Sequence, residues 1–163
     1  MIESLGHQSY GAWTMETKSL SKESIVYSFG VGNDISWDLE MIRRFGCTIY
    51  AFDPDPDAIA YLKTIEVPKE FVFSPIGLAT HDGVQRFYDP LKKGRVSRSA
   101  VKKSSRYTDL PVKRLETFMQ ELGHTRIDVL KMDIEGSEFS VIPSITDISI
   151  HQILVEIHTN FYR

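Results

Sequence analysis

The chain has 163 residues, with 42% hydrophobic and 25% charged side chains, a formal net charge of -3 and a single cysteine. This length supports one hydrophobic core, and the charge gives no reason to expect nonspecific nucleic-acid binding. The lone cysteine excludes an intrachain disulfide and a cysteine-rich metal site. No apolar run reaches the roughly 18 residues of a membrane span and the N-terminus lacks a signal-peptide pattern, so we expect a soluble, cytoplasmic protein without membrane partners.

The first part of the chain predicts a cover segment followed by a βαβα unit. Residues 1–24 are polar without a sustained hydrophobic period, so we expect them to cover the ligand site or a sheet edge. The remaining residues, 25–163, are expected to form one domain. Its first predicted elements are a buried strand at 25–29, a helix at 35–45 ended by Gly46, a strand at 48–52 and a helix at 58–65.

The second part continues the alternation of strands and helices. The predicted elements are a strand at 71–73, a hairpin formed by 76–79 and 84–88, a long basic loop at 89–109, a helix at 115–122, a strand at 127–132, a helix at 137–142 and a last strand at 153–157. Such alternation predicts an α/β fold with a parallel sheet covered by helices.

The turn after the first predicted strand indicates a nucleoside site. Gly30 and Gly32 allow close approach of backbone to a ligand, and Asp53 follows the second strand, where a carboxylate can accept both ribose hydroxyls. A dinucleotide pyrophosphate would disfavour carboxylates near this turn, yet Asp34 and Asp38 occur there. The charges therefore favour S-adenosylmethionine, which carries a sulfonium and an ammonium group.

Two segments resemble a known family. Residues 128–138, Asp-Val-Leu-Lys-Met-Asp-Ile-Glu-Gly-Ser-Glu, closely resemble the hallmark segment of the FkbM family of S-adenosylmethionine-dependent methyltransferases, and Tyr-Ala-Phe-Asp-Pro-Asp-Pro at 50–56 resembles its second motif. The resemblance covers roughly residues 25–158, and the glycine turn is similar to the methyltransferase-like branch. It implies a Rossmann-like parallel-sheet sandwich of the class I methyltransferase type and O-methylation of a hydroxyl on a small molecule or carbohydrate.

The chain departs from this family pattern in three places. Ser28 stands where an acid commonly precedes the first glycine, and Asp34 replaces a further glycine, so we assign the role of the missing acid to Asp34. The usual C-terminal strand hairpin is absent, which would leave strand 153–157 as an uncovered apolar edge. We therefore expect either a homo-oligomer formed through that strand or a fragment of a longer protein.

The candidate site residues follow the predicted strands. Asp133 is the leading candidate for the base that takes the hydroxyl proton, with Glu135, Glu156 and His158 as alternatives. Glu156 interrupts an apolar strand, so it is expected to line a polar pocket or to pair with Lys131 or His158. The expected cofactor contacts are Ser28, Gly30, Gly32, Asp34, Asp53, Asp55, Gly77 and Asp133.

Other interpretations of these residues stay open. The four candidate catalytic side chains could supply hard ligands to a divalent metal, but their spacing is not diagnostic and we assign no metal. Glu138 is expected to cap the following helix or to lie around its first turn, where the helix dipole favours a carboxylate. The basic run from Lys92 is either a solvated loop or a lid that binds an anionic substrate. The alternatives to a methyltransferase are a noncatalytic S-adenosylmethionine-binding or interaction module and, ranked last, an NAD-dependent oxidoreductase.

Overall fold

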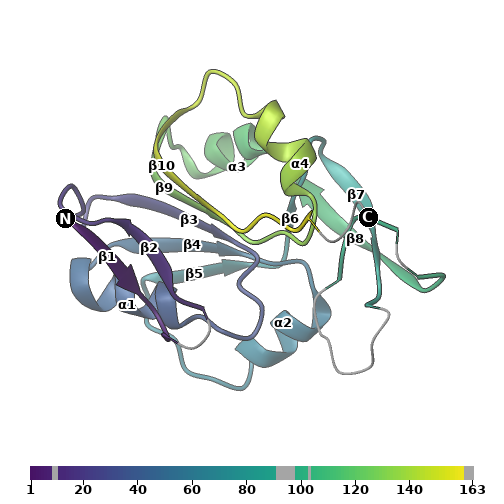
Figure 1. Cartoon of the computed structure of the whole chain (residues 1–163), viewed down its shortest axis with the longest axis horizontal. Coiled ribbons are helices and arrows are strands. Elements are labelled where there is room, and N and C mark those ends of the chain that lie inside the picture. The colour runs from purple at the N-terminus through teal and green to yellow at the C-terminus, as the bar shows by residue number, and fades with distance from the viewer. Residues whose placement is uncertain (9–10, 91–97, 103, 160–163) are drawn as a thin grey trace.

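A five-stranded parallel sheet forms the centre of the molecule (Figure 1). The computed structural model describes residues 1–8, 11–90, 98–102 and 104–159. The strand order is β10-β9-β3-β4-β5, so the chain builds outward from β3 on one side and then returns to add β9 on the other. The strands are β3 (Ile25–Phe29), β4 (Thr48–Phe52), β5 (Phe71–Ser74), β9 (Arg126–Met132) and β10 (Ser149–Val155).

Helices cover both faces of this sheet, as the alternating pattern predicted (Figure 1). On one face α1 packs together with a short N-terminal hairpin, and on the other α3 and α4 pack. The helices are α1 (Ser36–Phe45), α2 (Pro56–Leu62), α3 (Leu115–Leu122) and α4 (Glu138–Val141), which continues as the 3-10 helix η1 (Ile142–Ser144). The α/β fold and its parallel sheet are confirmed.

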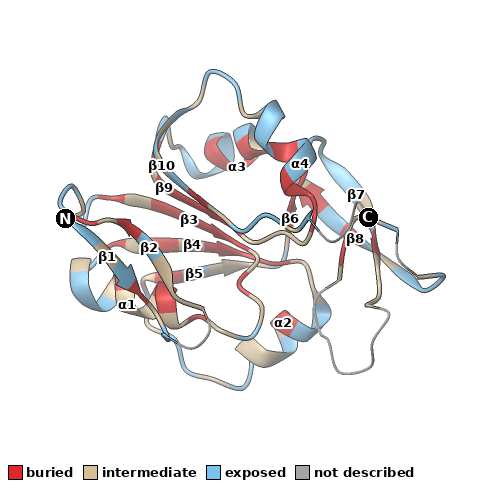
Figure 2. Cartoon of the chain, in the orientation of Figure 1, coloured by how far each residue is buried: buried red, intermediate tan, exposed pale blue. Residues whose placement is uncertain are grey.

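Alternation along the strands divides the core into two layers. In β3, Val26 contributes to the layer beneath α1, whereas Tyr27 and Phe29 contribute to the layer beneath α3. The ring of Phe29 stacks on that of Phe52 with centroids 4.6 Å apart, and Phe118 of α3 closes against both rings. Figure 2 shows the buried residues concentrated on the central strands. These strands are largely apolar on both sides, as a parallel sheet covered on both faces requires.

The N-terminal residues form the hairpin β1 (Ile2–Leu5) and β2 (Trp13–Glu16). Leu5 and Met15 are buried in the core layer beneath α1. The side chain of Gln152 in β10 accepts from the backbone N–H of Glu16 and donates to its carbonyl, at 3.0 and 2.8 Å. These two hydrogen bonds hold the hairpin beside β10, at the edge of the sheet.

The predicted hairpin after β5 is wrong. β6 (Gly77–Leu78) and β7 (Gly83–Tyr88) do not pair with each other, because β8 (Tyr107–Lys113) lies between them, parallel to β6 and antiparallel to β7. β8 was not predicted from the sequence because Pro111 interrupts a short apolar pattern next to the basic loop. The long loop therefore ends before residue 107, and its residues 91–97 and 103 lie outside the described part.

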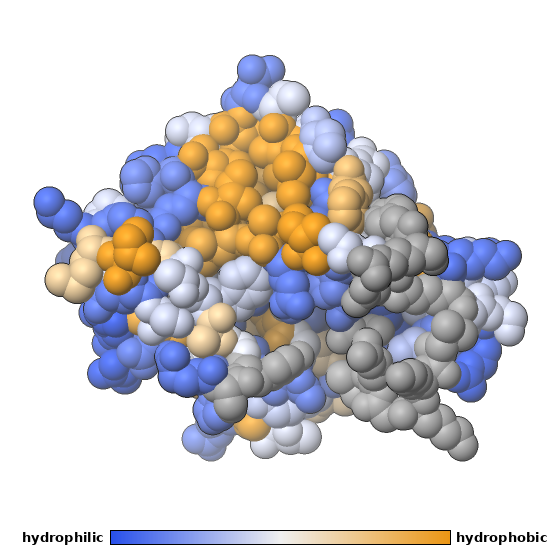
Figure 3. Space-filling model, viewed as in Figure 1, coloured by the Kyte–Doolittle hydropathy of each residue, from blue (hydrophilic) through white to orange (hydrophobic). Residues whose placement is uncertain are grey.

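The last strand begins and ends earlier than predicted, at 149–155 rather than 153–157. β10 pairs with β9 alone and forms the sheet edge, as expected, and no further strand follows it within the described residues. Figure 3 shows hydrophobic side chains gathered over β10 and α4. The exposed large hydrophobic residues of α4, η1 and β10 are Phe139, Ile142 and Ile153. Pairing of this edge with a second copy stays a prediction. None of the described helices is both long and apolar enough to cross a membrane.

Candidate functional site

A cavity of about 650 Å³ opens at the carboxyl ends of β3, β4 and β9. This is the point where the strand order reverses, which is where open parallel sheets bind ligands. Its walls include the turn after β3, Asp53 after β4 and Asp133 after β9, with Trp13 of the N-terminal hairpin beside them. The volume lies within the usual range for small-molecule sites.

The two glycines of the turn have different roles. Gly30 has φ +76°, and a Cβ built on it would lie 1.7 Å from the carbonyl oxygen of Asp133. Because Gly30 has no side chain, the end of the neighbouring strand β9 can pack against it. The sequence had suggested that this space receives a ligand. Gly32 has φ +54°, a Cβ added to it would meet nothing within 4 Å, and its N–H donates to Asp53 Oδ2 at 2.9 Å. Gly32 is thus the glycine that faces open space in the cavity wall.

These environments predict unequal effects of alanine substitution. Gly30→Ala is expected to destabilise the fold by more than about 4 kcal/mol, because a methyl group cannot share space with a backbone carbonyl. Gly32→Ala should cost only about 1 to 2 kcal/mol, the cost of a left-handed conformation without a clash. Chemical denaturation of both variants measures the difference, and equal free energies of unfolding would contradict this account.

Asp53 is buried, 6% exposed, and links the turns that follow two neighbouring strands. Its Oδ2 accepts from Gly32 N–H and its Oδ1 from Asp55 N–H, both at 2.9 Å. Burial raises the pKa of Asp53, and these two backbone hydrogen bonds oppose that rise. Each carboxylate oxygen keeps a further lone pair, so the side chain can also accept from a hydroxyl in the cavity.

Asp55 also lies in the cavity wall, but its carboxylate already has partners. It caps α2 by accepting from Asp57 N–H at 2.9 Å and pairs with the guanidinium of Arg98. Arg98 further contacts Asp57 at 3.2 Å and Asp89 at 3.1 Å. This network joins the segment before β8 to the first turn of α2 and forms one side of the cavity.

The other expected cofactor contacts divide into two groups. Asp34 lines the cavity, and its Oδ1 accepts from Ser36 N–H at 2.8 Å at the start of α1. Gly77 lines it as well, packed so that a Cβ would lie 2.9 Å from Pro54. Ser28 is fully buried behind the turn and is not part of the cavity wall, so the structure does not bring it to this site.

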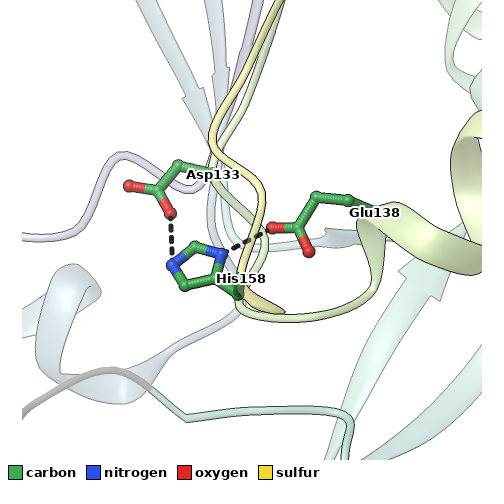
Figure 4. Close-up of side chains that lie close together, drawn as sticks. All are labelled: Asp133, Glu138 and His158. Atoms are coloured by element: carbon green, nitrogen blue, oxygen red, sulfur yellow. Dashed lines mark hydrogen bonds and ion pairs between the residues drawn. The ribbon is translucent and has the colours of Figure 1, made fainter. Parts of the chain in front are cut away.

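Three of the predicted catalytic residues surround the fourth. Nε2 of His158 lies 3.6 Å from Asp133, 3.7 Å from Glu135 and 3.7 Å from Glu156. Nδ1 of the same ring donates to Glu138 Oε1 at 2.9 Å, and Figure 4 shows the ring between Asp133 and Glu138. The imidazole is therefore held on one side and faces three carboxylates on the other.

Glu138 is fully buried and holds the turn that leads into α4. Its two carboxylate oxygens accept from the backbone N–H groups of Ile134 and Gly136 at 3.0 and 2.7 Å. The residue thus shapes the preceding turn and orients His158. It lies in the first turn of α4, as one form of the expectation had it, but its side chain makes no capping hydrogen bond to that helix. Glu135, within this turn, adopts φ +52°, an uncommon conformation for a residue with a side chain.

Glu156 corrects one expectation from the sequence. It lies just beyond the end of β10 with its side chain 57% exposed, so no burial cost has to be offset there. Of its two expected partners it approaches His158, whereas Lys131 contacts Ser28 and Gly30 instead. Its expected place in the wall of the cavity is observed.

The crowding of acids shifts the protonation of this cluster. Burial, followed by the nearby Glu156, raises the pKa of Asp133 to about 6. The hydrogen bond to Glu138 raises the pKa of His158 to about 9, against the effect of burial. Asp133, Glu138 and His158 offer ligand atoms within 4.8 Å of one another, but a protonated His158 supplies a cation to the group without a metal. Near neutral pH the cluster combines a carboxylate able to accept a proton with a fixed positive charge.

Sequence reasoning missed Lys131 as a member of the site. It lies within β9, in an apolar run of sequence, yet it forms part of the cavity wall. The partnership of Glu138 with His158 was missed too, because 20 residues separate the two positions. Of the two tryptophans, Trp37 is buried in the core and Trp13 lines the cavity.

The strand order, the glycine turn after β3 and the acids after β4 and β9 together define a Rossmann-like fold of the methyltransferase type. Residues 24–163 match the methyltransferase FkbM domain, so the chain belongs to that family of methyltransferase domains.

Two curated relatives support this assignment. The chain is 27% identical over 145 residues to "Probable methyltransferase-like protein 24" of Rattus norvegicus, and 25% identical over 145 residues to the protein of the same name of Homo sapiens. Each alignment covers 86% of this chain and 34% of the relative, so the chain spans about a third of their length. No solved structure gives a significant match.

Proposed function

We propose that this domain binds S-adenosylmethionine and transfers its methyl group to a hydroxyl of a small molecule or carbohydrate. The family assignment supports methyl transfer, and the buried Asp53 at the cavity wall supports a ribose-bearing cofactor. The observation that carries the proposal is the coincidence of this acid with Gly32 and Asp133 around one cavity at the switch point of the sheet.

The charges of the cavity suit this cofactor better than a dinucleotide. Among the described residues, seven carboxylates line the cavity against two cations, Arg98 and Lys131. Arg98 is already paired with three acids, so it does not offset the remaining negative charge. A negative wall attracts a sulfonium and an ammonium group and repels a pyrophosphate.

The residues of the cavity divide the work of methyl transfer. S-adenosylmethionine supplies, when bound, a methyl group already activated by the sulfonium, so the protein has mainly to align and to exclude water. In the proposed reaction Asp53 holds the ribose. Asp133 accepts the proton that the attacking hydroxyl loses as its oxygen bonds to the methyl carbon and the carbon–sulfur bond breaks. His158, oriented by Glu138, keeps a positive charge beside Asp133.

Calorimetric titration of the purified chain with S-adenosylmethionine and, separately, with NAD tests this proposal. We expect saturable binding of S-adenosylmethionine only, followed by formation of S-adenosylhomocysteine when a panel of hydroxylated compounds is added. Binding of NAD alone would favour an oxidoreductase. Binding of S-adenosylmethionine without product from any acceptor would favour the noncatalytic module.

A further inference from the structure

Lys131 is a buried lysine beside the glycine turn. The mechanism proposed above gives it no role. The residue is 4% exposed, yet it forms part of the cavity wall. Nζ lies 3.4 Å from Ser28 Oγ and 3.5 Å from the carbonyl oxygen of Gly30. It also lies 5.1 Å from the ring centre of Trp13 and 5.8 Å from that of Trp37.

The charge of Lys131 acts on three nearby acids, because it opposes the rise that burial causes in the pKa values of Asp38, Asp53 and Asp133. Among the described residues no carboxylate forms an ion pair with Nζ, and its two hydrogen bonds are long. Removing an ammonium group from water without a counter-ion is costly, so such a group is expected to meet an anion or to lie close to one.

Asp38 is a buried acid that interacts with the charge of Lys131, but the two groups form no direct ion pair. It is fully buried in α1, and neither carboxylate oxygen has a hydrogen-bond partner. Burial raises the pKa of Asp38, an effect that the charge of Lys131 opposes. Because Asp38 is not part of the cavity wall, the face of Lys131 toward the cavity is left for a ligand.

The surroundings of Lys131 complement a zwitterion. Asp34 and Asp133 line the same cavity as Lys131, so its wall carries a positive group and negative groups together. An amino acid moiety carries a carboxylate and an ammonium group on one carbon atom. The methionine end of S-adenosylmethionine has this chemistry, whereas its adenosine end is neutral.

We propose that Lys131 binds the α-carboxylate of the methionine moiety of S-adenosylmethionine, with Asp34 on the side of the α-ammonium group. This inference rests on the proposed function, and it assigns to Lys131 a role in distinguishing ligands that carry the carboxylate from those that lack it. A charge-assisted hydrogen bond of this kind corresponds to a difference in affinity of about 10- to 100-fold.

Binding of three ligands by calorimetry tests the assignment without any turnover. The ligands are S-adenosylmethionine, its decarboxylated form, which lacks only the carboxylate, and 5′-methylthioadenosine, which lacks the whole amino acid moiety. The wild-type chain should bind S-adenosylmethionine about 10- to 100-fold more tightly than the decarboxylated form. Lys131→Met should remove this preference and leave the affinity for 5′-methylthioadenosine within about threefold.

A second variant guards against a folding defect. Because Lys131→Met leaves Asp38 buried without a nearby cation, the double variant Lys131→Met, Asp38→Asn removes both charges and should show the same loss of preference. Lys131→Arg keeps a cation and should retain part of the preference. Equal affinity of the wild-type chain for S-adenosylmethionine and its decarboxylated form would overturn the assignment to Lys131. Binding of none of the three ligands by the wild-type chain would instead overturn the proposed function.

Discussion

Replacing Asp53 with alanine is expected to weaken the binding of S-adenosylmethionine by at least about 100-fold, because two ribose hydroxyls lose a charged acceptor. The buried carboxylate lies where the turns after β3 and β4 meet, and each of its oxygens is already fixed by a backbone N–H group. Its orientation is therefore set before a ligand enters. Calorimetric titration of the variant measures the effect.

The matched control for this variant is Asp57→Ala. Asp57 lines the same cavity and is exposed, but its carboxylate forms an ion pair with Arg98 and does not link the two turns. We expect its dissociation constant for S-adenosylmethionine to stay within about threefold of the wild-type value, because exposed ion pairs contribute little. The thermal unfolding temperatures of both variants show whether weaker binding comes from a lost ligand contact or from a destabilised fold. Wild-type affinity in a folded Asp53→Ala variant would contradict the ribose assignment.

The Asp53 and Lys131 variants together divide the cofactor into two parts. 5′-Methylthioadenosine keeps the ribose and lacks the amino acid moiety, so its binding should fall in Asp53→Ala and persist in Lys131→Met. Decarboxylated S-adenosylmethionine should show the same pattern. A general disturbance of the cavity would weaken every ligand in both variants, and it would thereby be distinguished from two specific contacts.

The central sheet could be predicted from the sequence because its strands are short and apolar. A turn follows each strand, and after it the spacing of hydrophobic residues changes. β3 and β4 were predicted with their observed bounds, as was α3. β8 was missed because three of its seven residues are exposed and Pro111 interrupts its pattern. Its position between β6 and β7 depends on pairing across a basic loop, which no local pattern encodes.

Most of the candidate site was predictable because its side chains lie in the turns that follow strands. Asp53, Asp133 and Glu135 fulfil this condition, and all three line the cavity. Lys131 does not, because it lies inside a strand and becomes part of the site only when Gly30 and Trp13 pack around it. The role of Gly30 was also hidden, since its close contact with the Asp133 backbone joins residues about a hundred positions apart.

Asp133→Asn is expected to lower turnover by about 10²- to 10⁴-fold, the usual contribution of a positioned general base. The amide keeps the size of the side chain but cannot accept the hydroxyl proton. Because Asp133 is one of several acids in the cavity wall, the dissociation constant for S-adenosylmethionine should change less than about fivefold. The rate is measured with the acceptor that the hydroxyl panel provides, and Glu116→Gln, on the exposed side of α3, serves as the control.

The pH dependence of turnover distinguishes Asp133 from the other acids of the cluster. Asp133 acts as a base only when ionised, so the wild-type rate should fall as the pH decreases through about 6. The positive charge of His158 is lost as the pH rises through about 9, which should give a second decline on the alkaline side. Asp133→Asn should lose the acidic limb and keep the alkaline one. If the acidic limb survives at the same pH in this variant, the proton is taken by another group, and Glu135 and Glu156 become the residues to replace, because both face the same nitrogen of His158.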